Sequence, residues 1–244
     1  MPRQFVRYVE PFAGSACVFF ELQPKVSVLA DINAELIDAY LTIRDNPQEI
    51  HQILSVFPRG KDGYIAVRSM PVENTDSFFR AARFIYLNRF CFNGLYRTNK
   101  AGAFNVPYGG DRSGELPTLS LLRQLAQCLQ NVVFIRGDFT QTLHITKPGD
   151  FVYMDPPYKV ESRRVFKEYS AMAFSREDVV ALRSSMVTLD SRGIKFLVSY
   201  AVSAEADILS QGFNRQELRV RRNIAGFASA RRDSREVFIY NYNL

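Results

Sequence analysis

One tetrapeptide, Asp155-Pro156-Pro157-Tyr158, carries groups suited to a reaction at an amine on an aromatic ring. Such a nitrogen is a poor nucleophile because its lone pair is delocalised into the ring. Acceptors around the amine hydrogens, here the Asp155 carboxylate and the Pro156 carbonyl, would favour a pyramidal nitrogen whose lone pair points at an electrophile. Two proline rings hold that carbonyl in place because each fixes φ. Tyr158 offers a face on which a base can stack, worth about 1–3 kcal/mol.

A second group of residues has the spacing of a nucleoside-binding site. Small residues between Glu10 and Ala16 let a ligand approach the backbone at a helix start, and Asp31 lies about twenty residues further on, where a carboxylate can bind ribose hydroxyls. Gly14 is the only glycine of this loop, so the GxGxxG pattern is absent. A pyrophosphate cradle is therefore poorly supported, and a nucleoside cofactor without phosphates fits better. Taken alone, the segment could equally be an ordinary strand-to-helix turn.

A parallel sheet would bring these residues together. Short apolar runs alternate with amphipathic stretches, which predicts an α/β fold in which helices cover a parallel sheet. Acidic residues stand at four predicted strand ends, namely Glu10, Asp31, Asp138 and Asp155. Because ligands of open parallel sheets bind at the carboxyl ends of the strands, these four carboxylates should share one edge.

The periodicity predicts where each element begins and ends. The predicted strands cover residues 6–11, 26–30, 132–136, 151–154, 194–199, 213–220 and 236–242, and the predicted helices cover residues 16–22, 33–44, 76–90, 119–129, 176–191 and 204–211. A more polar, less periodic region from 57 to 117 contains one of these helices and a loop rich in Gly and Asn. We therefore expect a main domain formed by 1–56 and 118–244, with 57–117 as an insertion.

The composition fits one globular, enzyme-sized unit, because the 244 residues are 47% hydrophobic and 23% charged. Cys17, Cys91 and Cys128 are widely spaced and the two histidines are isolated, so neither a disulfide framework nor a metal site is expected. Neither a signal peptide nor a membrane-length apolar run is visible, which predicts a cytoplasmic protein without a membrane partner. The net charge of +6 favours a polyanionic partner.

These motifs resemble those of the Dam-type adenine-specific DNA methyltransferases of the alpha group, over nearly the whole chain. The resemblance rests on the segments 8–14, 29–33, 88–97, 104–109, 137–139 and 155–158. It implies a Rossmann-like, S-adenosylmethionine-dependent methyltransferase sheet, with a partly helical DNA target-recognition region inserted at 57–117. The implied reaction is methyl transfer to the exocyclic 6-amino group of an adenine flipped out of the duplex. The implied setting is the cytoplasm of a bacterial or phage-infected cell.

The resemblance carries roles over to individual residues. Catalysis falls to Asp155, Pro156, Pro157 and Tyr158. The cofactor, released as S-adenosylhomocysteine, contacts Glu10, Pro11, Phe12, Ala13, Gly14, Asp31, Asp138, Phe139 and Asp155. Double-stranded DNA contacts Phe92, Asn93, Leu95, Arg97, Asn99, Pro107 and Tyr108. The family's chemistry implies no metal.

The DNA-reading segments imply a recognition sequence. Arg97 matches the arginine with which relatives that recognise GATC read a guanine, in agreement with the bidentate pairing of Arg with guanine in the major groove. GATC is therefore the implied site. Two places depart from the family pattern: residues 110–114 lack the expected basic and aromatic pattern, and Ser199-Tyr200 stands where relatives have a Ser-Asn pair beside the catalytic pocket.

A further departure concerns a segment with a pattern like Lys-Trp-x-Gly-Gly-Lys, which relatives carry upstream of the first strand. Three explanations are open: a truncated start, a second chain that supplies the segment, or weak cofactor binding with lost or changed activity. The alternative functions are accordingly a catalytically impaired DNA-binding homologue, and methylation of adenine in RNA. A restriction–modification partner, an orphan regulator and a phage enzyme would look alike in the sequence.

Arginines concentrate near the C-terminus around residues 223–230, at Arg215, Arg219, Arg221, Arg222, Arg231, Arg232 and Arg235. Since phosphate contacts dominate the affinity of protein–DNA interfaces, we expect a clamp on the DNA backbone. The alternative is an exposed loop with scattered charge.

Overall fold

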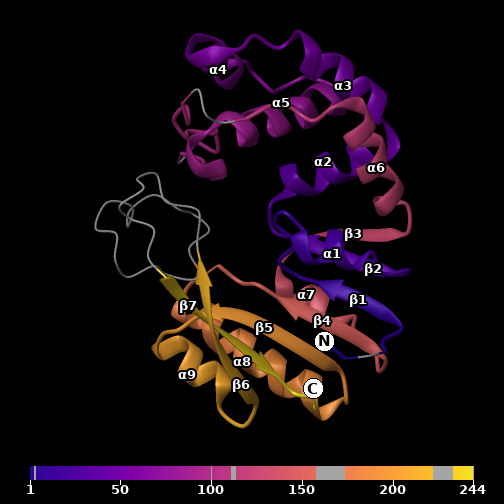
Figure 1. Ribbon diagram of the computed structural model, residues 1–244, viewed down its shortest axis with the longest axis vertical. Coiled ribbons are helices and arrows are strands. Elements are labelled where there is room, and N and C mark those ends of the chain that lie inside the picture. The colour runs from indigo at the N-terminus through magenta and orange to yellow at the C-terminus, as the bar shows by residue number, and fades with distance from the viewer. Residues whose placement is uncertain (3, 100, 111–113, 158–173, 222–232, 244) are drawn as a thin grey trace. The chain divides into compact units, whose positions relative to one another are not determined.

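The computed structural model describes residues 1–2, 4–99, 101–110, 114–157, 174–221 and 233–243. Within these ranges the chain forms two compact units. Of the described residues, the sheet unit comprises those within 1–33, 131–157 and 174–243, and the helical unit comprises those within 34–130. Figure 1 labels the elements of both units. In the described part of the chain, no helix is long and apolar enough to cross a membrane.

The sheet unit is built on seven strands in the order β3-β2-β1-β4-β5-β7-β6. Their bounds are β1 Arg7–Glu10, β2 Ser27–Asp31, β3 Val132–Arg136, β4 Asp150–Met154, β5 Lys195–Ala201, β6 Asn214–Arg221 and β7 Asp233–Tyr240. The first five strands are parallel, and β7 is antiparallel to both β5 and β6. The strand order reverses between β1 and β4, and this switch point is where open α/β sheets of the Rossmann type bind their ligands.

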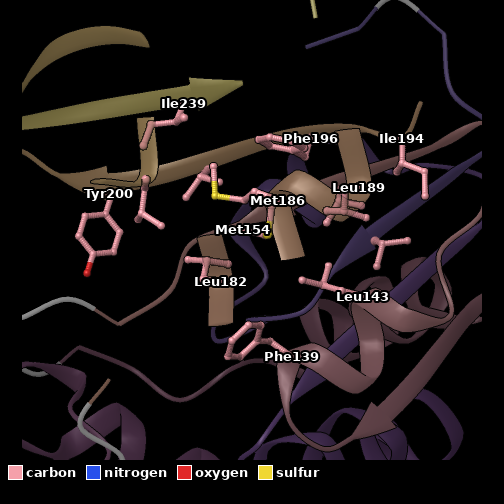
Figure 2. Packing of buried hydrophobic residues seen from close by; sticks show 14 of the residues in the cluster. Phe139, Leu143, Met154, Leu182, Met186, Leu189, Ile194, Phe196, Tyr200 and Ile239 are labelled. Atoms are coloured by element: carbon pink, nitrogen blue, oxygen red, sulfur yellow. The ribbon is translucent and has the colours of Figure 1, made fainter. Parts of the chain in front are cut away.

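Helices α1 Cys17–Leu22, α7 Phe139–His144, α8 Arg176–Ser191 and α9 Ala204–Ser210 belong to the same unit. Apolar side chains of α7, α8 and α9 pack with Val152 and Met154 of β4 and with Phe196 of β5 in one buried cluster. Figure 2 shows Leu182, Met186 and Leu189 of α8 within this cluster. Burial stabilises each large apolar side chain by about 1.5–3 kcal/mol, so this core holds the strand ends of the switch point in place.

The helical unit contains α2 Ala34–Asp45, α3 Pro47–Val56, α4 Gly60–Ser69, α5 Ser77–Phe90, the short 3-10 helix η1 Phe92–Gly94 and α6 Leu119–Leu129. α5 packs against α2, α3 and α4, whereas α6 packs against α2 and α3. The fully buried Tyr64 and Tyr86 join α4 to α5, with ring centroids 6.4 Å apart. The Tyr86 hydroxyl also donates to the Pro58 carbonyl at 2.6 Å. α5 is therefore the central helix of this unit.

The predicted α/β class is confirmed, and the predicted elements agree with the observed ones to within about two or three residues at most ends. Three helices were missed. α3 starts with Pro47 at its first turn, which reads as a helix breaker although proline is favoured there. α4 contains two glycines, and α7 has only six residues, too few to show a period. The predicted insertion 57–117 lies inside the helical unit, which extends further to residues 34 and 130; its role in DNA recognition stays a prediction.

Candidate active site

The loop after β1 is folded tightly against the end of β2. The Ala13 N–H donates to the Ala30 carbonyl at 2.8 Å, and the Ala16 N–H donates to the Ala13 carbonyl at 2.6 Å. Gly14 and Ala16 have φ values of +47° and +50°. The left-handed conformation costs a residue such as Ala16 roughly 1–2 kcal/mol. Backbone held in a sparsely populated conformation is common at binding sites, so this turn marks the loop as a candidate ligand cradle.

Asp31 ends β2 and connects two neighbouring loops. Its Oδ2 accepts from the Gly14 N–H at 3.0 Å, and its Oδ1 accepts from the Asn33 N–H at 2.8 Å. Its backbone carbonyl accepts from the Gly137 N–H at 3.1 Å, which ties the end of β3 to the same point. Each carboxylate oxygen has further lone pairs, so these bonds fix the carboxylate while leaving capacity for hydroxyl groups. The predicted ribose-binding residue is therefore held in a defined orientation.

Glu10 ends β1 and is buried, with only 3% of its surface exposed. The Tyr8 hydroxyl donates to Glu10 Oε2 at 2.9 Å. Burial raises the pKa of Glu10 to about 8; the hydrogen bond from Tyr8 lowers this pKa, and the nearby charge of Asp155 raises it. Burial, with a smaller contribution from Glu10, also raises the pKa of Tyr8 far above its ordinary range. The carboxyl is thus mostly protonated at pH 7, and a cation beside it would favour the ionised form.

Asp155 and Pro156 follow β4, the strand that pairs with β1 at the switch point. The Asp155 residue is exposed, whereas Pro156 is buried. Burial raises the pKa of both Glu10 and Tyr153, and the nearby charge of Asp155 raises both further, so the three groups share one electrostatic environment. The fourth residue of the predicted catalytic motif, Tyr158, lies outside the described residues.

The pair Ser199-Tyr200, which departs from the family pattern, lies on β5 beside β4. Ser199 is buried, and a hydrogen bond between its side chain and Tyr153 lowers the pKa of that tyrosine. Burial raises the pKa of Tyr200 to about 12, with a contribution from Glu205. Figure 2 shows the Tyr200 ring at the margin of the hydrophobic cluster. Ser199 and Tyr200 are thus both buried on this strand.

Asp138 and Phe139 mark the end of β3 and the start of α7. Asp138 is the N-cap of this helix, and its Oδ1 accepts from the Thr140 N–H at 2.8 Å and from the Thr140 hydroxyl at 2.6 Å. Phe139 stacks on Phe12, with ring centroids 5.1 Å apart and planes inclined by 30°. Phe174 contacts both rings at centroid distances of 6.0 and 5.9 Å. Sequence reasoning did not identify Phe174, because it lies far from every motif.

The sheet unit therefore gathers the predicted cofactor and amine-binding residues at one edge. Glu10, Asp31, Asp138 and Asp155 stand at the ends of four adjacent parallel strands or within two residues after them, as their positions in the sequence predicted. A set of carboxylates at this edge suits a ligand that carries positive charge and hydroxyl groups. Among the described residues, no group of three or more His, Cys, Asp or Glu side chains could hold a metal ion.

The predicted DNA-reading residues lie in the helical unit, in the segment 91–110. Two isolated antiparallel bridges, Cys91 with Tyr108 and Thr98 with Phe104, bring the two halves of this loop together. The Val106 carbonyl accepts from the Tyr64 hydroxyl at 2.8 Å and from Arg68 Nη1 at 2.9 Å. Both donors come from α4. These two bracing residues were missed by sequence reasoning, because the helix that carries them was not predicted.

Within this loop, Arg97 lies next to Asn105. Arg97 Nε donates to Asn105 Oδ1 at 2.7 Å, and Arg97 Nη2 donates to the Asn105 carbonyl at 3.2 Å. Asn99 Oδ1 accepts the N–H groups of Ala101 and Ala103, each at 3.0 Å, and so shapes the loop tip. Leu95 is 45% exposed.

The remaining predicted DNA contacts differ in exposure. Pro107 is exposed, Phe92 and Asn93 are half-buried, and Tyr108 is half-buried against Tyr64 with ring centroids 5.5 Å apart. Pro107 is thus accessible at the loop surface, whereas Tyr108 packs against α4.

The C-terminal arginines fall into different environments. Arg215 is engaged with acidic partners, Asp207 at 2.5 Å and Glu217 at 2.9 Å. Arg219 of β6 and Arg235 of β7 are exposed and face each other directly in the antiparallel register. Arg222, Arg231 and Arg232 lie outside the described residues, and so does the side chain of Arg221. Like charges directly opposite each other on neighbouring strands are destabilising.

Comparison with known proteins gives an independent result. The pattern of the D12 class N6 adenine-specific DNA methyltransferases matches residues 1–224. The type II methyltransferase M1.LlaDCHI of Lactococcus lactis subsp. cremoris is 34% identical over 251 residues, an overlap of 99% of this chain and 88% of the relative. The type II methyltransferase M.MjaIII of Methanocaldococcus jannaschii is 32% identical, with 97% of this chain and 88% of the relative covered. A DNA adenine methylase of Vibrio cholerae serotype O1 is 33% identical, with 89% and 80% covered.

Among solved structures, a precorrin 8w decarboxylase of Methanobacterium thermoautotrophicum aligns over 99% of this chain and 84% of its own, with a TM-score of 0.41 and 12% identity. That likeness is too low to support an argument about function.

The seven-stranded sheet has the Rossmann-like α/β architecture of the methyltransferase class. The chain belongs to the D12 class N6 adenine-specific DNA methyltransferase family. It is an enzyme of this class, its family depends on S-adenosylmethionine, and the family's substrate is DNA. The comparisons give no support for a second chain that completes it.

Proposed function

We propose that this chain binds S-adenosylmethionine at the carboxyl edge of β1 to β4 and methylates the 6-amino group of an adenine in duplex DNA, within the sequence GATC. The observation that carries the proposal is the pairing of β1 with β4, which sets Glu10 and Asp155 beside each other at the switch point. Beside them, the oriented carboxylate of Asp31 suits ribose hydroxyls. Next to the capping residue Asp138, the half-buried Phe12 stacks on the buried Phe139 and would give the nucleoside an apolar neighbour.

The chemistry of the bound cofactor fits this set of residues. S-adenosylmethionine supplies an electrophilic methyl group on a positively charged sulfur and needs no acid or base to become reactive. Glu10 and Asp155 would bind positive charge, and Asp31 would fix the nucleoside. Most of the rate acceleration would then come from holding the two reactants in line, which can contribute about 7–11 kcal/mol.

Asp155 and Pro156 would act on the other reactant. The Asp155 carboxylate and the Pro156 carbonyl would accept hydrogen bonds from the adenine amine and so orient its nitrogen lone pair towards the methyl donor. The Asp155 carboxylate would take up the proton that the nitrogen loses on methylation. Burial of Pro156 keeps its carbonyl fixed. Tyr158, by the resemblance, would stack on the flipped base, because an amine that is stacked and paired inside the duplex is out of reach.

The helical unit would read the DNA sequence. Arg97 would pair with a guanine, and the residues 92–108 around it would contact the neighbouring bases and phosphates; this is the function we assign to the region 57–117. Arg219 and Arg235 would bind the DNA backbone, because a phosphate between them relieves the repulsion of two facing like charges. A cytoplasmic location, as the sequence predicts, would give access to the chromosome.

The test is transfer of a tritiated methyl group from S-adenosylmethionine to duplexes with and without GATC, and to RNA of the same sequence. Asp155→Ala should abolish labelling, whereas Glu177→Ala, which removes an exposed carboxylate on α8, should not. Label on GATC duplexes alone supports the whole proposal. Label on other duplexes contradicts GATC, preferred labelling of RNA contradicts the substrate, and DNA binding without label indicates a catalytically impaired homologue.

A further inference from the structure

We propose that Asn105 is a positioning residue that sets the orientation of the Arg97 guanidinium for guanine recognition; the inference rests on the proposed role of Arg97. Two hydrogen bonds join the pair, from Arg97 Nε to Asn105 Oδ1 at 2.7 Å and from Arg97 Nη2 to the Asn105 carbonyl at 3.2 Å. Donors at two separate atoms of the planar guanidinium fix the direction of its plane. A bidentate pair with the O6 and N7 atoms of guanine depends on that plane.

The backbone on both sides of this contact is also held. The Asn105 N–H donates back to the Arg97 carbonyl at 3.0 Å, so the two residues are joined through main chain and side chain together. The adjacent pair, Thr98 and Phe104, forms an antiparallel bridge. Asn105 is therefore a fixed acceptor and not a side chain that follows Arg97 wherever it moves.

The next residue links this pair to the helical core. The Val106 carbonyl accepts from two side chains of α4, Tyr64 at 2.8 Å and Arg68 at 2.9 Å. α4 is in turn held from α5, because the buried Arg83 donates to the Val67 carbonyl at 3.1 Å and to the Arg68 carbonyl at 2.7 Å. Both carbonyls lie in the last turn of α4, beyond the regular i+4 hydrogen bonds of the helix, and the Val67 carbonyl also accepts from the Met70 N–H at 3.3 Å. The backbone next to Asn105 is thus held by α4, and α4 is held by α5.

The orientation of the Arg97 guanidinium must be restrained by a neighbour, because an arginine side chain has several rotatable bonds. An unrestrained Arg97 would have to lose this freedom when it pairs with a base, and it could also pair with other acceptors in the groove. A guanidinium already held in one plane favours guanine over bases whose acceptors lie elsewhere. We therefore expect Asn105 to contribute to discrimination between sequences more than to the rate of methyl transfer itself.

The experiment is a double-mutant cycle on Arg97→Ala and Asn105→Ala, measured with the full chain. The readout is the ratio of two kcat/KM values. One is measured with a GATC duplex, and the other with a duplex in which the G·C pair read by Arg97 is replaced by an A·T pair. Arg97→Ala should lower this ratio by about 10–100-fold, the range expected for one bidentate base contact. Asn105→Ala should lower it about three- to tenfold, chiefly through KM, the order expected for the loss of one typical hydrogen bond. Asn105→Ala should then have no further effect in the Arg97→Ala background.

Asn88→Ala is the matched control, because the Asn88 side chain donates to the Gly94 carbonyl of the same loop at 3.1 Å. It should lower stability without changing the ratio. If Asn105→Ala lowers the ratio equally in both backgrounds, its role is general support of the loop and the inference is wrong. If Arg97→Ala lowers the ratio and Asn105→Ala does not, the inference fails while the proposed role of Arg97 stands. If Arg97→Ala leaves the ratio unchanged, the proposed role of Arg97 fails and the inference fails with it.

Discussion

The buried carboxyl of Glu10 makes the stability of this protein depend on pH in a direction opposite to that of most carboxyl groups. Burial raises its pKa from 4.5 to about 8 in the folded protein. Between these two values the folded state binds more protons at this group than the unfolded state does, so stability falls as the pH rises from about 5 to about 8. One pKa unit corresponds to about 1.4 kcal/mol, so the free energy of unfolding at pH 9 is lowered by up to roughly 4–5 kcal/mol.

Glu10→Gln should remove this dependence, because an amide keeps an acceptor for the Tyr8 hydroxyl but carries no charge. We expect urea unfolding at pH 9 to give a higher free energy of unfolding for Glu10→Gln than for the unchanged protein, and values at pH 5 to be nearly equal. Glu21→Gln, an exposed glutamate of α1, serves as the control and should follow the unchanged protein. Equal pH profiles for all three proteins would refute the reasoning, since Glu10 would then ionise as readily in the folded state as in the unfolded one.

Three further changes test other parts of the structure. Asp31→Ala removes an acceptor that holds two backbone N–H groups and should weaken S-adenosylmethionine binding at least about tenfold in calorimetry, while unchanged affinity would argue against its role at the ribose. Gly63→Ala places a Cβ 2.7 Å from the carbonyl carbon and oxygen of Pro58 and should cost about 1–3 kcal/mol, so an unchanged urea midpoint would contradict that close approach. Arg235→Gln relieves cross-strand repulsion and should leave stability unchanged or raise it by about 0.2–1 kcal/mol. The same change should weaken DNA binding and reduce the dependence of log K on log salt by about 0.9, whereas an unaltered salt dependence would exclude a phosphate contact.

The sheet unit could be predicted from the sequence because its signals are local. Buried parallel strands read as short apolar runs, and the acidic residue that follows each run marks the edge where ligands bind. The spacing between Glu10 and Asp31 was therefore enough to place both carboxylates at one edge. Each acidic residue of this edge lies at the end of a strand or within two residues after it, so the strand prediction also places the acidic residue.

The supporting contacts could not be predicted, because they join residues far apart in the sequence. Nothing local indicates that Tyr64 and Arg68 reach the Val106 carbonyl, or that Phe174 packs against Phe12 and Phe139. The raised pKa of Glu10 follows from burial, which no motif encodes. A side chain that packs against a distant element shows its role only after the fold has brought the two together.

The most direct test of the central claim is to identify the methylated product. Duplex DNA containing GATC is incubated with the protein and S-adenosylmethionine that carries a deuterated methyl group, digested to nucleosides and analysed by mass spectrometry. We predict that the label appears in N6-methyl-2′-deoxyadenosine and is lost with Asp155→Ala. Label on another base, or undiminished label in the Asp155→Ala protein, would contradict the assignment of adenine chemistry to the edge between β1 and β4.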